Sequence, residues 1–183
     1  MFDKVVIVTR ETQLEQLVRQ FSAKGQAKFY IEQSQRSFRE KAQRERGSVA
    51  DTQSPAAVSL PFRSIEEADT LYKQSLRYVQ GVIPPEIKVQ HIDWTFLPNF
   101  LFGEHDLVVA IGQDGLVVNI AKYLTDQPIV AVNPDPSRFD GVLLPFTAHT
   151  AGTRMRDILR GEFNTAPISI AQASLDDGQV LRS

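Results

Sequence analysis

The residues best placed to do chemistry lie in the Gly-Gln-Asp-Gly stretch at 112–115, directly after the apolar run 107–111. That run predicts a buried strand and residues 116–124 have apolar side chains at helical spacing, so 112–115 is a strand-to-helix turn. At the carboxyl end of a parallel strand, small residues let main-chain N–H groups approach phosphate. A carboxylate there binds Mg²⁺ or accepts a proton from an attacking hydroxyl. The plainer interpretation is that Asp114 only occupies the turn and caps the helix.

Two further polar residues are expected at the same edge of the sheet. Asn133 ends an apolar run, and Arg10 follows the β-branched run 4–9. Asn133 could orient a ribose hydroxyl, or it could close a local loop, because Asn-Pro often begins a turn. Arg10 could contact phosphate if the first strand is central in the sheet, or it could pair with Glu11 or Glu15.

The elements that must position these residues alternate between strands and helices. The predicted strands are residues 4–9, 27–32, 87–94, 107–111 and 128–133. The first predicted helix begins at a cap, Thr9 or Thr12, and ends at Gly25. The second covers 64–81 and begins with a capping box of Ser64 and Glu67, and the third covers 116–124. The last runs from Thr147 to Arg160 and ends before Gly161. Strands separated by helices predict an α/β fold with an open, mostly parallel sheet.

The sequence also suggests how the chain is divided. Residues 1–165 are expected to form the α/β domain, and 166–183 a hairpin with an Asp-Gly turn. Residues 34–62 have few large apolar groups and are expected to form a flexible insertion, whose arginines could alternatively close over a bound phosphate. The aromatic residues of 95–102 could line a pocket, although a hydrophobic loop covering one end of the sheet explains them as well.

Composition excludes several classes of function. The 183 residues contain no cysteine, which rules out disulfides, thiolate metal sites and thiol catalysis. A net charge of -2 gives no reason to expect nucleic acid or a membrane surface as a partner. Because no long apolar segment is present, the protein is expected to be cytoplasmic. The histidines His91, His105 and His149 are too scattered to predict a metal site.

Several motifs, taken in order, resemble those of the NAD kinase family. That family has a strand ending in Gly-Gly-Asp-Gly, a helix, a strand ending in Gly-Ile-Asn, a Gly-Phe-Leu turn, and a helix ending in Leu-x-Gly-x-Tyr or Phe. The matching stretches are DLVVAIGQDG at 106–115, PIVAVNP at 128–134, GVL at 141–143 and ILRGEF at 158–163. The order and spacing are more specific than a single Asp-Gly turn would be. The resemblance spans about residues 4–183 and implies the Rossmann-like N-terminal domain of that family.

The resemblance implies a kinase that transfers a phosphoryl group from ATP, or from polyphosphate, to the 2′-hydroxyl of NAD with the help of Mg²⁺. Asp114 matches the aspartate that accepts the proton of the attacking hydroxyl. The nucleotide-binding positions that carry over are Gly112, Gln113, Gly115, Asn119 and Asn133, with Arg10 as a further candidate for phosphate contact.

Four features depart from the family pattern, and one of them is the Asn-Pro-Asp-Pro stretch at 133–136 in place of a glycine-rich continuation. Gln113 replaces the second motif glycine, and would be strained if that position required a positive φ. Leu116 stands where threonine is usual, and Asn119 stands where arginine or histidine is usual. These departures indicate an atypical branch. They leave two alternatives open, a nucleotide-sensing or assembly domain without catalysis, and a kinase for another hydroxyl compound such as a sugar or lipid.

In the family, the hairpin leads into a β-rich second domain that holds adenine and much of the substrate. This sequence ends before the Asn-Glu or Asn-Asp motif that opens that domain, so the chain is expected to be truncated and poorly active alone. The exposed strand at its end is expected to favour a homo-oligomer.

Overall fold

The structure is a computed structural model that describes residues 2–45, 61–169, 171–174, 177 and 179–182. The chain forms two compact units. One unit combines Met1–Arg10 with Leu71–Ser183, and the other is Glu11–Thr70. The first unit contains the sheet and every residue that the sequence nominates for the site.

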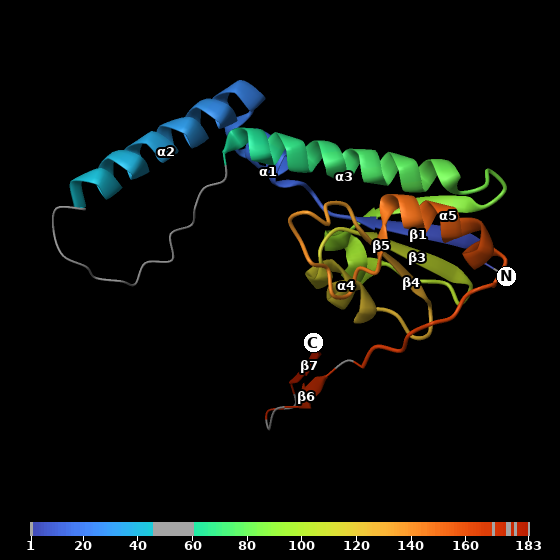
Figure 1. Cartoon of the computed structure of the whole chain (residues 1–183). Helices are drawn as coiled ribbons and strands as arrows, with labels where there is room; N and C mark the ends of the chain where they lie inside the picture. The colour runs from blue at the N-terminus through green and yellow to red at the C-terminus, as the bar shows by residue number, and fades with distance from the viewer. Residues whose placement is uncertain (1, 46–60, 170, 175–176, 178, 183) are drawn as a thin grey trace. The chain divides into compact units, whose positions relative to one another are not determined.

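An all-parallel sheet forms the centre of the first unit, so the predicted α/β fold with a mostly parallel sheet is confirmed (Figure 1). Its strands are β1 (Lys4–Thr9), β2 (Lys88–Asp93), β3 (Asp106–Ile111), β4 (Ile129–Asn133) and β5 (Phe146–Thr147), in the order β2-β1-β3-β4-β5. The predicted strands at 4–9, 87–94, 107–111 and 128–133 are therefore present. Strand β5 was not predicted, because it has only two residues.

Helices cover both faces of the sheet. They are α3 (Phe62–Val82), of which the part from Leu71 belongs to this unit, α5 (Ala148–Leu159), α4 (Asp114–Ala121) and the 3-10 helix η1 (Trp94–Asn99). Side chains alternate along β1, so Val5 and Ile7 pack with α3 and α5, while Val6 and Val8 pack with α4 and η1. Strands buried on both faces need continuous apolar sequence, which explains the unbroken runs in β1 and β3.

Helix α5 begins where the sequence predicts. Thr147 is its N-cap, and forms a capping box with Thr150. Gly161 follows the helix with a φ of +84°. A left-handed residue after the last turn is a common way to end a helix, and glycine adopts it without steric cost.

The second unit consists of helix α1 (Gln13–Phe21), helix α2 (Lys24–Glu45) and the first part of α3. Thr12 is the N-cap of α1 and forms a capping box with Glu15. The Thr12 hydroxyl also donates to the Asp69 carboxylate at 2.6 Å. The helix ends at Ser22, which has a φ of 61°, and not at the predicted stop Gly25.

The predicted strand at 27–32 is wrong, because these residues belong to helix α2. Its β-forming residues suggested a strand, but tertiary packing decides between the two structures. Ala27 and Ile31 are one helical turn apart and pack together beside α1, whereas Phe29 is 67% exposed. That arrangement satisfies a helix period, and a strand would have placed Phe29 on the same face as Ala27 and Ile31.

Two other predicted boundaries also differ from the structure. Helix α3 begins at Phe62 after Pro61, so Ser64 lies inside the first turn and is not its N-cap. In the proposed insertion at 34–62, α2 continues as far as Glu45, while residues 46–60 lie outside the described residues.

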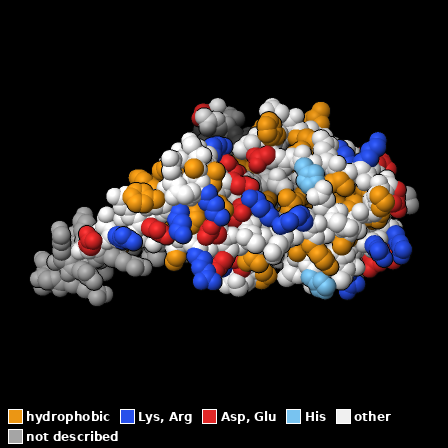
Figure 2. Space-filling view, turned by 90° about the horizontal axis from the view of Figure 1, so that it is seen from above, with side chains coloured by type: hydrophobic (Ala, Val, Ile, Leu, Met, Phe, Trp, Pro, Cys, Tyr) orange, Lys and Arg blue, Asp and Glu red, His pale blue; other side chains and the backbone are white. Residues whose placement is uncertain are grey.

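The predicted C-terminal hairpin is formed by β6 (Gln172–Ser174) and β7 (Val180–Arg182), which pair antiparallel. In the aromatic segment, Leu97 is buried, and Phe100 and Phe102 pack against the sheet core on the α4 face. No helix in the described part of the chain is long and apolar enough to cross a membrane. On the face seen in Figure 2, acidic and basic side chains are interspersed.

One buried ion pair joins the beginnings of two central strands. Asp106 at the start of β3 is 4% exposed. Its Oδ2 lies 3.0 Å from the Lys4 Nζ of β1 and accepts the Gly103 N–H at 2.8 Å. The Lys4 ammonium also lies 5.4 Å from the Phe100 ring centroid. The Asp106 carboxylate therefore links the starts of β1 and β3 with the connection that precedes β3.

We expect Asp106→Ala to lower the free energy of unfolding by about 2 kcal/mol or more, because it leaves the Gly103 N–H and the Lys4 ammonium without their shared acceptor. Asp3→Ala removes an exposed carboxylate close to Lys4 in the sequence and should change the free energy of unfolding by less than about 0.5 kcal/mol. Urea unfolding of both variants measures the difference. Equal midpoints for the two variants would show that the buried pair does not stabilise the sheet.

Candidate functional site

The predicted site residues gather at the carboxyl edge of the sheet, next to the point where the strand order reverses. Strands β1 and β3 are parallel neighbours, but the chain leaves β1 toward β2 and leaves β3 toward β4 on the other side. The connections then diverge, and in open α/β sheets the crevice between them is where ligands bind. Arg10 follows β1 at this point, and the 112–115 turn follows β3.

Arg10 and Gln113 are hydrogen-bonded across this switch point. The Arg10 Nη1 donates to the Gln113 Oε1 at 3.2 Å, and both side chains are exposed. The Arg10 main-chain N–H donates to the Tyr72 hydroxyl of α3 at 3.1 Å. The Tyr72 hydroxyl therefore holds the main chain of Arg10, and the Gln113 amide oxygen holds its guanidinium.

No ion pair of Arg10 occurs among the residues that the structure describes. The glutamates considered as its partners have other contacts. Glu11 pairs with Arg19 at 2.8 Å, and the Glu15 carboxylate accepts the Thr12 N–H at 2.9 Å. Within the described part of the chain, neither glutamate therefore forms an ion pair with the Arg10 guanidinium at the edge of the sheet.

Gln113 is the N-cap residue of α4 and has extended backbone angles, with φ at -116° and ψ at 164°. The strain considered for a side chain at this motif position is therefore absent, because no positive φ is required. Its side chain makes no capping hydrogen bond to the helix. The amide remains turned to Arg10 instead.

The two glycines of the turn have different surroundings. A Cβ on Gly112 would lie 3.2 Å from the Leu116 Cδ2 and 3.6 Å from the Arg10 Cδ, so a larger residue would crowd the turn. A Cβ on Gly115 would meet nothing within 4 Å. The first turn of α4 is thus open above Gly115, where a ligand could approach the main chain closely.

Asp114 is half-buried and its carboxylate is bound to a distant loop. Its Oδ1 accepts the Leu143 N–H at 2.9 Å, and its Oδ2 accepts the Val142 N–H at 3.2 Å. It is the first residue of α4, and Gln113 takes the N-cap position. A carboxylate has about four acceptor positions, so this arrangement orients the group and leaves others for a ligand.

Asn133 lies at the same edge as Asp114, since the Gly112 N–H donates to the Val132 carbonyl at 3.1 Å. Its side chain is 4% exposed. The Nδ2 donates to the Phe139 carbonyl at 2.8 Å, and the Oδ1 accepts the Asp135 N–H at 3.0 Å. These contacts close the loop after β4, which is the plainer of the two roles expected for Asn133.

Asn119 lies further along α4, and its Oδ1 accepts a hydrogen bond from the Lys122 Nζ at 3.4 Å. The structure therefore brings Arg10, Gln113 and Asp114 to one edge, places Asn133 beneath the adjoining loop, and leaves Asn119 beside Lys122.

The described residues contain no group of three or more histidine, cysteine, aspartate or glutamate side chains that could hold a metal ion. Asp135, the other acidic group after β4, pairs with Arg138 at 3.2 Å. Mg²⁺ is commonly bound by one or two carboxylates together with substrate phosphates. Asp114 is the carboxylate of the 112–115 turn, and by itself it could bind Mg²⁺ only together with phosphate or water ligands.

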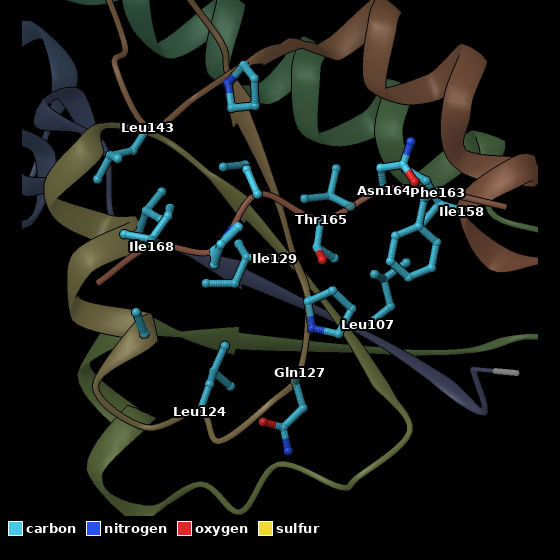
Figure 3. Close-up of a pocket in the computed structure, with 18 of the residues that line it drawn as sticks. Leu107, Leu124, Gln127, Ile129, Leu143, Ile158, Phe163, Asn164, Thr165 and Ile168 are labelled. Atoms are coloured by element: carbon cyan, nitrogen blue, oxygen red, sulfur yellow. The ribbon is translucent and has the colours of Figure 1, made fainter. Parts of the chain in front are cut away.

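A groove lies elsewhere in the first unit, along β4 (Figure 3). It has a volume of about 950 Å³, and its apolar lining includes Leu124, Ile129, Leu143, Ile158, Phe163 and Ile168. Strand β5 pairs with β4 only at Val132 and Asn133, so residues 129–131 border the groove without a strand on that side among the described residues. None of the predicted site residues lines it, and we place the candidate site at the switch point because the polar groups converge there.

Sequence reasoning missed the contacts that link distant segments. Tyr72 lies within the predicted helix 64–81 and was not among the predicted site residues, yet its hydroxyl accepts the Arg10 N–H. The main-chain donors of Val142 and Leu143 were also missed. The Gly-Val-Leu motif at 141–143 was the available signal, because it marked the loop that meets Asp114.

Neither the scan against protein-family models nor the search of curated proteins gives a match for this sequence.

We expect Gly141→Ala to lower the free energy of unfolding by more than about 1 kcal/mol and to disturb the loop after β4. Gly141 has a φ of +63°, and an added Cβ would lie 2.6 Å from the Asn133 Nδ2. Gly81→Ala is the matched control, because Gly81 lies in α3 with nothing within 4 Å of the new Cβ. Urea unfolding measures both, and a Gly141→Ala protein as stable as Gly81→Ala would contradict this account of the loop.

Proposed function

We propose that the chain is a phosphotransferase of the NAD kinase type, which binds nucleotide at the carboxyl edge of its sheet. The reaction moves the γ-phosphoryl group of ATP, or a phosphoryl group of polyphosphate, onto the 2′-hydroxyl of NAD. The P–O bond to the donor breaks, a P–O bond to the ribose forms, and the hydroxyl proton leaves with a base. The products are NADP and ADP, or NADP and a shortened polyphosphate.

The observation that carries the proposal is the meeting of Arg10, Gln113 and Asp114 at one switch point. Arg10, which makes no ion pair among the described residues, the open first turn of α4 and the Asp114 carboxylate are the kinds of group that phosphoryl transfer uses. Such transfer depends mainly on positioning and on neutralising charge, so few side chains are needed. We also propose that the sheet and its helices have the Rossmann-like arrangement of the NAD kinase N-terminal domain.

Each residue has a distinct role in the proposed reaction. Arg10 binds a phosphate group of the nucleotide, and the first turn of α4 adds main-chain N–H donors and a favourable dipole. Asp114 accepts the hydroxyl proton on a position that Val142 and Leu143 do not occupy. Mg²⁺ bound to ATP would supply neutralisation of the phosphate charge.

A second candidate function is nucleotide binding without turnover, as in a sensing or assembly domain. The specific observation in its favour is that both Asp114 oxygens already accept main-chain N–H groups of one loop. Asn133 is likewise used within that loop. In this case Asp114 would serve to hold the loop beside the ligand, and no proton transfer would occur.

The test measures NADP formation from NAD by the full chain, with ATP and Mg²⁺ or with polyphosphate as the donor. Asp114→Asn should lower kcat at least ~100-fold with little change in nucleotide affinity, because a positioned general base contributes about that much. Gly141→Ala disturbs the loop that orients the Asp114 carboxylate but keeps the carboxylate itself, so it should lower kcat by a clearly smaller factor than Asp114→Asn.

An equal loss of kcat in Asp114→Asn and Gly141→Ala would overturn the base assignment, because holding the loop would then explain both. Saturable binding of ATP or NAD with no NADP formation would support the second candidate. Absence of both binding and turnover would contradict both functions.

A further inference from the structure

We propose that Gln113 is a positioning residue, which holds the Arg10 guanidinium across the β1–β3 switch point so that it reads a phosphate group of the ligand. The inference rests on the proposed function, since it assigns a phosphate-bearing ligand to the same edge. It goes further by giving a role to the residue that replaces a glycine of the NAD kinase motif.

The geometry supports this role because Gln113 contacts Arg10 with a neutral acceptor. The Arg10 Nη1 donates to the Gln113 Oε1 at 3.2 Å, and a guanidinium has five N–H donors in a fixed fork. The remaining donors stay available for an anion. A glycine at position 113 would leave the arginine without this contact, and its long side chain would adopt many more conformations.

The choice of an amide at position 113 also preserves the charge of the site. A carboxylate at the same place would form an ion pair with Arg10 and compete with the ligand phosphate. An amide orients the guanidinium without compensating its charge. In the part of the chain that the structure describes, Arg10 makes no ion pair. The guanidinium can therefore form an ion pair with a phosphate group that binds at the switch point.

The main chain of Arg10 is fixed independently of its side chain. The Tyr72 hydroxyl accepts the Arg10 N–H at 3.1 Å, and β1 ends one residue earlier at Thr9. Changes at position 113 should therefore alter the direction of the guanidinium and leave the strand end in place. A guanidinium held in one orientation recognises phosphate in a bidentate manner, which a lysine ammonium cannot reproduce.

The experiment measures the affinity of the full chain for ATP and for adenosine, by calorimetry at low and at moderate salt. Arg10→Gln should weaken ATP binding about tenfold and leave adenosine binding unchanged, because it removes charge-assisted hydrogen bonds to phosphate. Gln113→Glu should weaken ATP binding comparably, and Gln113→Ala should do so by a smaller factor. Arg77→Gln is the matched control for loss of an exposed positive charge, since Arg77 lies on α3 and donates to the Lys73 carbonyl.

Preferential loss of ATP affinity in Arg10→Gln, Gln113→Glu and Gln113→Ala, with Arg77→Gln unchanged, supports the inference. If ATP binds the wild-type chain and the Arg10 and Gln113 variants equally well, the inference is overturned while the proposed nucleotide site stands. A loss in Arg10→Gln with no effect of either Gln113 variant also overturns it, since Gln113 would then not position the arginine. If ATP does not bind the wild-type chain, the proposed function fails, and this inference fails with it.

Discussion

Burial of the central strands on both faces is the constraint on which the rest of the structure depends. Strands β1, β3 and β4 lie between two helical layers, so their interiors are almost entirely apolar. Polar groups that could act on a ligand are thereby confined to the strand ends. All strands of this sheet are parallel, which brings those ends to a common edge. Between β1 and β3 the chain connections leave the sheet in opposite directions, toward β2 and toward β4, which in open α/β sheets opens a crevice at this edge. Arg10 and Asp114 lie at that edge, because each follows one of these two strands.

Asp114 connects this edge to the loop after β4, and the connection gives the carboxylate two possible uses. Hydrogen bonds to a charged acceptor contribute roughly 1.5–3 kcal/mol each, which offsets part of the conformational entropy that the loop loses when it is ordered. The Asn133 side chain also holds this loop, through hydrogen bonds to the Phe139 carbonyl and from the Asp135 N–H. Holding the loop and accepting a proton do not exclude each other, because one fixes the orientation that the other requires. The loop therefore forms part of the proposed site.

The strands could be predicted from sequence because continuous β-branched runs have few alternatives, as residues 4–9 and 107–111 illustrate. The helical structure of residues 27–32 could not be predicted from sequence, because it depends on how Ala27 and Ile31 pack beside α1. The common edge of Arg10, Asp114 and Asn133 followed from parallel topology alone. Their actual partners did not, because Val142 is 28 residues from Asp114 and Gln113 is 103 residues from Arg10. Hydrogen bonds between such distant positions leave no local pattern. The extended backbone of Gln113 also lay beyond prediction, since the motif suggested a glycine there.

The central claim is that phosphate-bearing nucleotide binds at the β1–β3 switch point. The most direct test is to titrate the chain, of 20.5 kDa, with ATP or NAD and to follow the backbone amide resonances by nuclear magnetic resonance. The account predicts that the largest shifts occur at Arg10, at residues 112–116 and at the loop residues Val142 and Leu143. Shifts concentrated along the apolar groove beside β4, around Ile129 and Ile158, would contradict it, because the ligand would then bind in that groove and not at the switch point.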